Sequence, residues 1–147
     1  MTGAPFENPS EEAIRSLLER VRRIAVVGLS PKPHRDSNRV SLYMQERGYE
    51  IIPIYPREER ILGAPVYRRV QEVPGSIDLV NVFRTSSALP EVTDDSLAAG
   101  APAIWFQLGC VDEDAAARAQ QQGVQVVMDR CLMVDHARLL GSSRRRI

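Results

Sequence analysis

Short apolar runs alternate with segments of helical periodicity along the chain. Residues 24–27 read Ile-Ala-Val-Val, and a run without polar alternation is typical of a strand buried on both faces of a parallel sheet. Comparable runs occupy residues 50–55, 77–83, 103–106 and 124–128. Because helices are expected between the runs, the pattern predicts an α/β fold. We expect a Rossmann-like three-layer arrangement around a five-stranded parallel sheet, with the strand order 3-2-1-4-5.

The expected helix starts are marked by residues that favour the N-cap position. Ser10 precedes two glutamates and an apolar face at helical spacing, which predicts a helix from residue 11. Further helices are expected from Ser37 or Asn38, from Ser86 or Ser87, from Asp112, and over residues 129–140. Residues 62–65 indicate a turn, and a short helix is expected near residues 70–73. Pro53 fits its strand only near an edge or a ladder end, because proline has no N–H to donate.

Length and composition restrict the class of protein. A chain of 147 residues can build one domain with its own core, and we expect a single domain over residues 1–147 with loose ends at 1–8 and 141–147. The formal net charge is zero and the sequence pI is about 6.7, which argues against a nucleic-acid-binding protein. No apolar run is long enough for a membrane span, and no signal peptide is evident. We therefore expect a cytoplasmic protein whose cysteines, Cys110 and Cys131, are thiols.

The segment between the first expected strand and its helix has features of a phosphate-binding turn. Gly28 ends the strand, a loop with two prolines follows, and a helix begins near Ser37; free backbone N–H groups at such a helix start attract phosphate. The loop is not the dinucleotide fingerprint, because Ser30 and Pro33 stand where glycines would be needed, and it is not a P-loop. It carries the cations and polar side chains of Ser30, Lys32, Arg35, Ser37, Asn38 and Arg39. An ordinary polar loop before a capped helix is the alternative interpretation.

In a parallel α/β sheet, ligands bind outside the carboxyl ends of the strands, where the strand order reverses. The second, third and fifth expected strands end near Arg57, Arg84 and Arg130. An NAD site would have an acidic residue after the second strand to bind the ribose hydroxyls, but residues 55–57 are Tyr-Pro-Arg. Arg57 suits a phosphate on the ribose, as in NADP or coenzyme A, and a solvated loop charge is the alternative.

A series of motifs gives the chain a family resemblance. They are, in order, IAVVGLS, PHRDSNRV, GYEIIPIYP, LGAPVYRRVQEVPGSIDLVNVFR, AIWFQLG and VMDRC, and together they span about residues 12 to 135. With these motifs the chain resembles the small stand-alone CoA-binding proteins. Their fold is similar to the CoA-binding domain of the succinyl-CoA synthetase alpha subunit. The synthetase loop is richer in glycine, so the phosphate cradle of this chain is expected to differ.

The resemblance implies a set of site residues. The diphosphate and the neighbouring phosphate would be held by Gly28, Ser30, Lys32, Arg35, Ser37 and Arg39. The adenosine would be flanked by Tyr55, Pro56 and Arg57, with Phe83, Arg84 and Ile104 on the opposite wall. The pantetheine side would be lined by residues 105–109, among them Trp105, Gln107 and Gly109.

The expected function is therefore binding of coenzyme A or an acyl-CoA. The sequence shows no nucleophile–base pair, so a binding module is favoured over an enzyme. Two alternatives stay open: an NADP-dependent oxidoreductase or sugar-nucleotide enzyme that uses the same crevice, and an interaction subunit with a vestigial nucleotide site. A protein partner or a homo-oligomer is compatible with the sequence, but no motif marks one. His34 and His136 show no metal-ligand spacing with the cysteines, so no metal is expected.

The two cysteines follow expected strand ends. Cys131 lies near a helix N-terminus, where the helix dipole stabilises a thiolate. A thiolate there would be able to exchange with the thiol of coenzyme A, and Cys110 is the competing position. A buried small residue is the simpler interpretation of Cys131.

Overall fold

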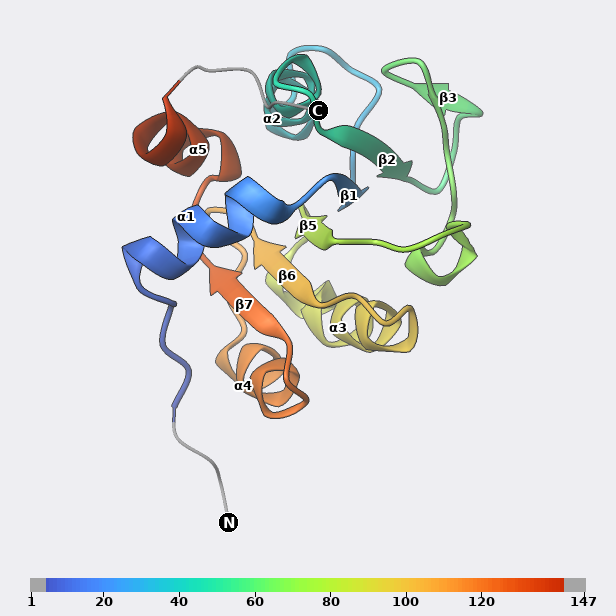
Figure 1. The fold of residues 1–147 in the computed structure, drawn as a ribbon. Helices are drawn as coiled ribbons and strands as arrows, with labels where there is room; N and C mark the ends of the chain where they lie inside the picture. The colour runs from blue at the N-terminus through green and yellow to red at the C-terminus, as the bar shows by residue number, and fades with distance from the viewer. Residues whose placement is uncertain (1–4, 142–147) are drawn as a thin grey trace.

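A five-stranded parallel sheet forms the centre of the molecule (Figure 1). The computed structural model describes residues 5–141. The strands are β1 (Arg23–Val27), β2 (Glu50–Ile54), β5 (Leu79–Val82), β6 (Ala103–Phe106) and β7 (Gln125–Met128). Every neighbouring pair is parallel. The predicted Rossmann-like α/β class with five parallel strands is confirmed.

The strand order is β2-β1-β5-β6-β7, which is 2-1-3-4-5 when these five strands are counted along the chain. It differs from the expected order in the place of the third strand, since β5 pairs with β1, with Ala25 opposite Val80. Pro53 gives a physical reason. Its carbonyl faces away from β1 and accepts a hydrogen bond from the N–H of Tyr67 at 3.0 Å. The missing N–H of Pro53 therefore also lies on the outer side, where β2 as an edge strand loses no ladder bond.

Helices cover both faces of the sheet (Figure 1). The helices α1 (Glu11–Arg20), α2 (Asp36–Glu46) and α5 (Leu132–Leu140) pack on one face, and α3 (Leu89–Ala98) and α4 (Glu113–Gln121) pack on the other. Side chains alternate between the faces along each strand. The core cluster under α1, α2 and α5 accordingly contains Val26 and Trp105, and the cluster under α3 and α4 contains Ala25 and Ile104.

The shorter elements lie between β2 and α3. The strands β3 (Arg60–Ile61) and β4 (Ala64–Pro65) form an antiparallel pair across the predicted turn, and the single 3-10 turns η1 (Val70–Glu72) and η2 (Ser86–Ala88) follow. After β4 the chain returns to the outer edge of β2, where Tyr67 lies opposite Ile54 in an isolated parallel bridge. This return places residues 66–68 beside the carboxyl end of β2.

Two of the predicted caps are confirmed. The side chain of Ser10 accepts a hydrogen bond from the N–H of Ala13 at 3.1 Å, and that of Asp112 accepts one from Ala115 at 3.0 Å. The predicted caps at Ser37 or Asn38 are wrong, because α2 begins at Asp36 and its N-cap residue, Arg35, makes no side-chain capping bond. The predicted starts of two other helices are also displaced. The helix α3 begins at Leu89 and not at Ser86 or Ser87, and α5 begins at Leu132 and not at residue 129.

The expected loose amino-terminal end is too long by several residues. Asn8 pairs with both main-chain groups of Met128: its Nδ2 donates to the carbonyl at 3.0 Å, and its Oδ1 accepts from the N–H at 2.8 Å. Phe6 packs against the core. The remaining parts of the expected tails, residues 1–4 and 142–147, lie outside the described residues. Within the described range, no helix is both long and apolar enough to cross a membrane.

We predict that Asn81→Leu stabilises the fold. Asn81 lies in β5, is 1% exposed, and neither its Oδ1 nor its Nδ2 has a hydrogen-bond partner among the described residues. Replacing the amide by methyl groups of similar shape removes the desolvation cost, so the free energy of unfolding should rise by about 1 kcal/mol. Urea denaturation measures it.

Ser96→Ala is the matched control, because the buried Ser96 Oγ does donate a hydrogen bond, to the carbonyl of Val92 at 2.8 Å. We expect this control to lose about 0.5–1.5 kcal/mol. A loss of stability in Asn81→Leu as well would show that the Asn81 amide is satisfied in solution.

Candidate functional site at the carboxyl edge of the sheet

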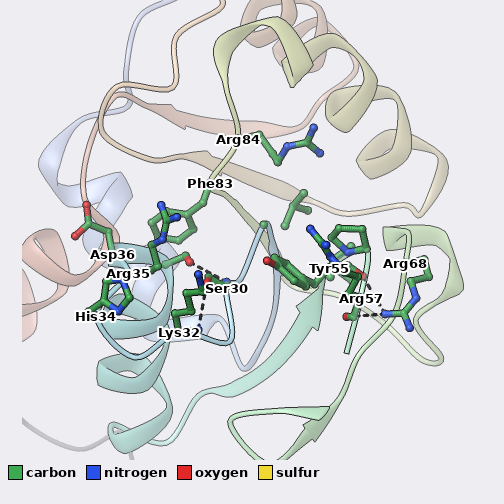
Figure 2. Close-up of a pocket in the computed structure, with 15 residues that line it drawn as sticks. Ser30, Lys32, His34, Arg35, Asp36, Tyr55, Arg57, Arg68, Phe83 and Arg84 are labelled. Carbon is green, nitrogen blue, oxygen red and sulfur yellow. Dashed lines mark hydrogen bonds between the residues drawn. The ribbon is translucent and has the colours of Figure 1, made fainter. Parts of the chain in front are cut away.

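A cavity of about 930 Å³ lies over the carboxyl ends of β1, β2 and β5 (Figure 2). The chain crosses from β2 past β1 to β5, so the direction of winding reverses between β1 and β5. Crevices at such a switch point bind ligands in doubly wound folds. Ten of the fifteen predicted site residues line the cavity: Gly28, Ser30, Lys32, Arg35, Ser37, Tyr55, Pro56, Arg57, Phe83 and Arg84.

Gly28 lines the cavity at the point where the ends of β1 and β5 approach each other with no side chain between them. Its φ is +84°, a conformation that favours glycine. A Cβ atom built on Gly28 would lie 2.1 Å from the carbonyl oxygen of Phe83. The N–H of Gly28 donates to the carbonyl of Ile54 at 2.9 Å, and the N–H of Phe83 donates to that of Val27 at 2.8 Å. Only glycine fits here without moving β1 from β5.

The side chains of Ser37 and Asn38 form hydrogen bonds with the main chain of the loop that follows Gly28. Ser37 Oγ accepts a hydrogen bond from the N–H of Ser30 at 2.9 Å, and Asn38 Nδ2 donates to the carbonyl of Ser30 at 2.9 Å. These bonds replace the capping role that the sequence predicted. As a consequence, the N–H groups of Asp36 and Ser37 in the first turn of α2 have no partner among the described residues. Open donors at a helix start favour an anion.

Unneutralised positive charge surrounds the cavity. None of its five cationic side chains has a carboxylate within ion-pair distance in the described part of the chain; they are Lys32, Arg35, Arg57, Arg68 and Arg84 (Figure 2). The one acidic residue in the wall, Asp36, pairs with Arg39. Several arginines outside this wall form ion pairs, as in the 2.6 Å pair of Arg69 with Asp95. The wall therefore suits a ligand with several negative charges.

Apolar surface lies beside these cations. Tyr55 and Pro56 follow β2, Phe83 follows β5, and Val27 and Ile54 complete the apolar part of the wall. Both Tyr55 and Phe83 are half-buried and pack against the core cluster under α2. Flat apolar surfaces next to cations can accommodate a heteroaromatic base together with its phosphates.

Sequence reasoning missed Arg68, His34 and Asp36 as cavity residues. His34 and Asp36 lie within the glycine loop and the first turn of α2, which the sequence had marked as a phosphate-binding segment. Arg68 lies elsewhere in the sequence and reaches the cavity because Tyr67 pairs with the edge of β2: the N–H of Tyr55 donates to the carbonyl of Tyr67 at 3.0 Å. No local pattern marks this pairing.

Two residues of β6 do not line the cavity, contrary to expectation. Ile104 and Trp105 are both 0% exposed and point into the two core clusters on opposite faces of the sheet. Trp105 Nε1 donates to the carbonyl of Arg130 at 2.8 Å. Helices cover both faces of the interior of β6, whereas the cavity is lined by the last residues of β1 and β2 and by residues beyond the strand ends.

Three other expected site residues also lie outside the cavity wall, and each has a structural partner. Arg39 pairs with Asp36 and donates to the carbonyl of His34 at 2.6 Å. Gln107 Oε1 accepts a hydrogen bond from the N–H of Leu132 at 2.9 Å, at the start of α5. The remaining contact joins the N–H of Gly109 to Asp129 Oδ1 at 2.8 Å. Arg130, the third strand-end arginine, forms a 2.6 Å pair with the buried Asp135.

The two cysteines are also outside the cavity wall. Cys110 is buried, and its Sγ lies 3.1 Å from the carbonyl oxygen of Arg84. Burial raises the pKa of the Cys110 thiol, which disfavours the thiolate form there. Cys131 is half-buried at the N-cap of α5, and its exchange with a ligand thiol stays a prediction. No group of three or more potential metal ligands occurs within residues 5–141.

Comparison with known proteins places this chain in a family. Residues 22–137 match the model of the CoA binding domain family. YneT, an uncharacterized protein of Bacillus subtilis, is 46% identical over 132 residues, covering 90% of this chain and 98% of YneT. The solved structure of a hypothetical protein from Pyrococcus horikoshii superposes with a TM-score of 0.89 at 36% identity, covering 96% of this chain and 99% of that one.

A shorter match involves a much larger protein. Over 59 residues the chain is 37% identical to the alpha subunit of an ADP-forming acetate–CoA ligase from Pyrococcus furiosus, covering 40% of this chain and 13% of that subunit. The family model, in contrast, spans most of the chain, as did the motifs that carried the resemblance. The chain belongs to the CoA binding domain family.

Proposed function

We propose that the chain binds coenzyme A, or an acyl-CoA through its nucleotide end, in the cavity over β1, β2 and β5. The observation that carries the proposal is the set of five cations without acidic partners among the described residues, which line the same cavity as the open amides of α2. Coenzyme A offers a diphosphate, a 3′-phosphate and an adenine ring. These groups match the cations and the apolar wall. Family membership favours this ligand over NADP.

Each part of the ligand has a proposed partner. The diphosphate lies over Gly28, where a side chain would block it, and accepts hydrogen bonds from the first turn of α2. Lys32 and Arg35 neutralise its charge. The adenosine lies against Tyr55 and Pro56, and Arg57 binds the 3′-phosphate.

We favour a binding module over an enzyme. The two serine hydroxyl groups in the wall belong to Ser30 and Ser37, and both accept hydrogen bonds from main-chain N–H groups of the loop. Neither hydroxyl donates a hydrogen bond to a general base among the described residues, so the pairing that activates a serine nucleophile is not formed there. The acyl group would then stay unchanged on the bound ligand.

The first prediction concerns ligand choice. Isothermal titration calorimetry with coenzyme A, NADP and NAD should show tightest binding for coenzyme A and weakest for NAD. The reason is that NAD lacks the third phosphate and that Arg57 stands where an NAD site would have an acid. Tighter binding of NADP than of coenzyme A would contradict the proposal.

A second prediction concerns the close approach at Gly28. In Gly28→Ala the new Cβ would collide with the main chain of Phe83, so we expect a loss of stability of about 1–3 kcal/mol together with loss of coenzyme A binding. Thermal melting and calorimetry measure the two effects.

Gly63→Ala is the control, because Gly63 also has a positive φ (+77°) but nothing lies within 4 Å of its built Cβ. This control should bind coenzyme A normally. Unchanged coenzyme A binding by folded Gly28→Ala would mean that the diphosphate does not lie over this turn.

A third prediction tests Arg57. Arg57→Ala should weaken coenzyme A binding by about 1.5–3 kcal/mol, the range for a charge-assisted hydrogen bond, and should affect dephospho-coenzyme A much less. Arg60→Ala is the matched control, since Arg60 donates to the carbonyl of Gly63 outside the cavity. Equal losses for both ligands would assign Arg57 to a different group of the ligand.

A further inference from the structure

Arg68 makes three hydrogen bonds to one short segment of the cavity wall (Figure 2). Its Nη1 donates to the carbonyl oxygen of Tyr55 at 3.1 Å and to those of Arg57 and Glu58 at 2.9 Å. One guanidinium nitrogen has two hydrogens, so at least one hydrogen is shared between two of these carbonyls. A single side-chain atom thus holds together the carbonyls of Tyr55, Arg57 and Glu58.

The segment that Arg68 holds contains an unusual backbone conformation. Glu58 has a φ of +72°, in the left-handed region that residues other than glycine, asparagine and aspartate seldom adopt. The preceding residue, Arg57, lines the cavity, and its side chain has no ion-pair partner among the described residues. A contact from outside the segment is needed to keep such a turn in one geometry.

Arg68 is itself attached to a rigid part of the fold. The N–H of the preceding residue, Tyr67, donates to the carbonyl of Pro53 in β2 at 3.0 Å, and the N–H of Arg68 donates to Glu72 Oε1 at 3.1 Å. The guanidinium is therefore anchored to the edge of the central sheet. A side chain that projects from a sheet edge can act as a fixed reference for a loop.

The guanidinium also has donors that this contact does not use. Within residues 5–141, Nε and Nη2 of Arg68 have no hydrogen-bond partner, and the side chain lines both the large cavity and a neighbouring one of about 190 Å³. We infer that Arg68 is the positioning residue of the site. Its Nη1 fixes residues 55–58 and thereby positions Arg57. Its Nε and Nη2 are left to donate hydrogen bonds to the anionic ligand. The ligand part rests on the proposed function; the positioning of the segment does not.

Hydrogen exchange of the ligand-free protein, followed by NMR, tests the positioning. The amides to follow are those of Tyr55 and Val66, which donate to the carbonyls of Tyr67 and Glu59 at 3.0 Å. In Arg68→Ala and Arg68→Lys both amides should exchange at least about ten-fold faster, while amides of β1 stay unchanged. Lysine cannot replace arginine, because it has no planar fork. Exchange within two-fold of wild type in both variants would overturn the inference.

Arg69→Ala is the matched control: it removes the same charge at the next position, but Arg69 is paired with Asp95 and lines only the smaller cavity. We expect wild-type exchange at Tyr55 and Val66 in this variant. Accelerated exchange there would show that a general loss of charge loosens the segment and would overturn the specific role of Arg68.

A double-mutant cycle tests the connection to Arg57. Arg57→Ala and Arg68→Ala should each weaken coenzyme A binding about ten- to a hundred-fold, and the double variant should lose clearly less than the product of the two losses, because both remove the same contact. Fully multiplicative losses would overturn the inference. If the wild type does not bind coenzyme A, the proposed function fails, and hydrogen exchange alone decides whether Arg68 positions the segment.

Discussion

At the carboxyl end of β1, the main chain of Gly28 passes so close to the carbonyl of Phe83 that no side chain fits between them. Everything at the site is arranged around this contact. It brings the ends of β1 and β5 together, and the N–H of Gly28 joins the end of β2 through the carbonyl of Ile54. The loop that leaves Gly28 is then held by Ser37 and Asn38, so that the first turn of α2 faces the same opening, with the N–H groups of Asp36 and Ser37 unpaired among the described residues.

Ion pairing differs between the cavity and the rest of the fold. Away from the cavity, seven of the described arginines are paired with carboxylates. Arg130 binds the buried Asp135 at 2.6 Å, and a hydrogen bond from Arg138 lowers the pKa of Glu11 and ties α5 to α1. Around the cavity the cations have no such partners among the described residues. A cluster of like charges costs free energy in the unliganded protein, and binding of a polyanion offsets that cost.

Short sequence patterns predicted the features that depend only on residues close together in the sequence. The apolar runs marked all five strands of the main sheet, and Ser10 and Asp112 marked two helix starts because capping requires only neighbours in sequence. The place of β5 beside β1 and the return of Arg68 to the edge of β2 depend on pairings between distant segments, which no short pattern records. Ile104 and Trp105 were misplaced because they precede the end of β6, where helices cover both faces of the sheet. Gln107 and Gly109 are occupied by contacts with α5 and with the residue after β7, which are equally non-local.

The account depends most on an anion at the start of α2, and an NMR titration of the labelled protein with coenzyme A tests this directly. The amide signals of Asp36 and Ser37, whose N–H groups are unpaired in the described structure, should shift strongly and saturate together with that of Gly28. Signals from α3 and α4, on the far face of the sheet, should stay in place. Saturable shifts that leave Asp36 and Ser37 unaffected would contradict the account, because the phosphates would then be bound elsewhere.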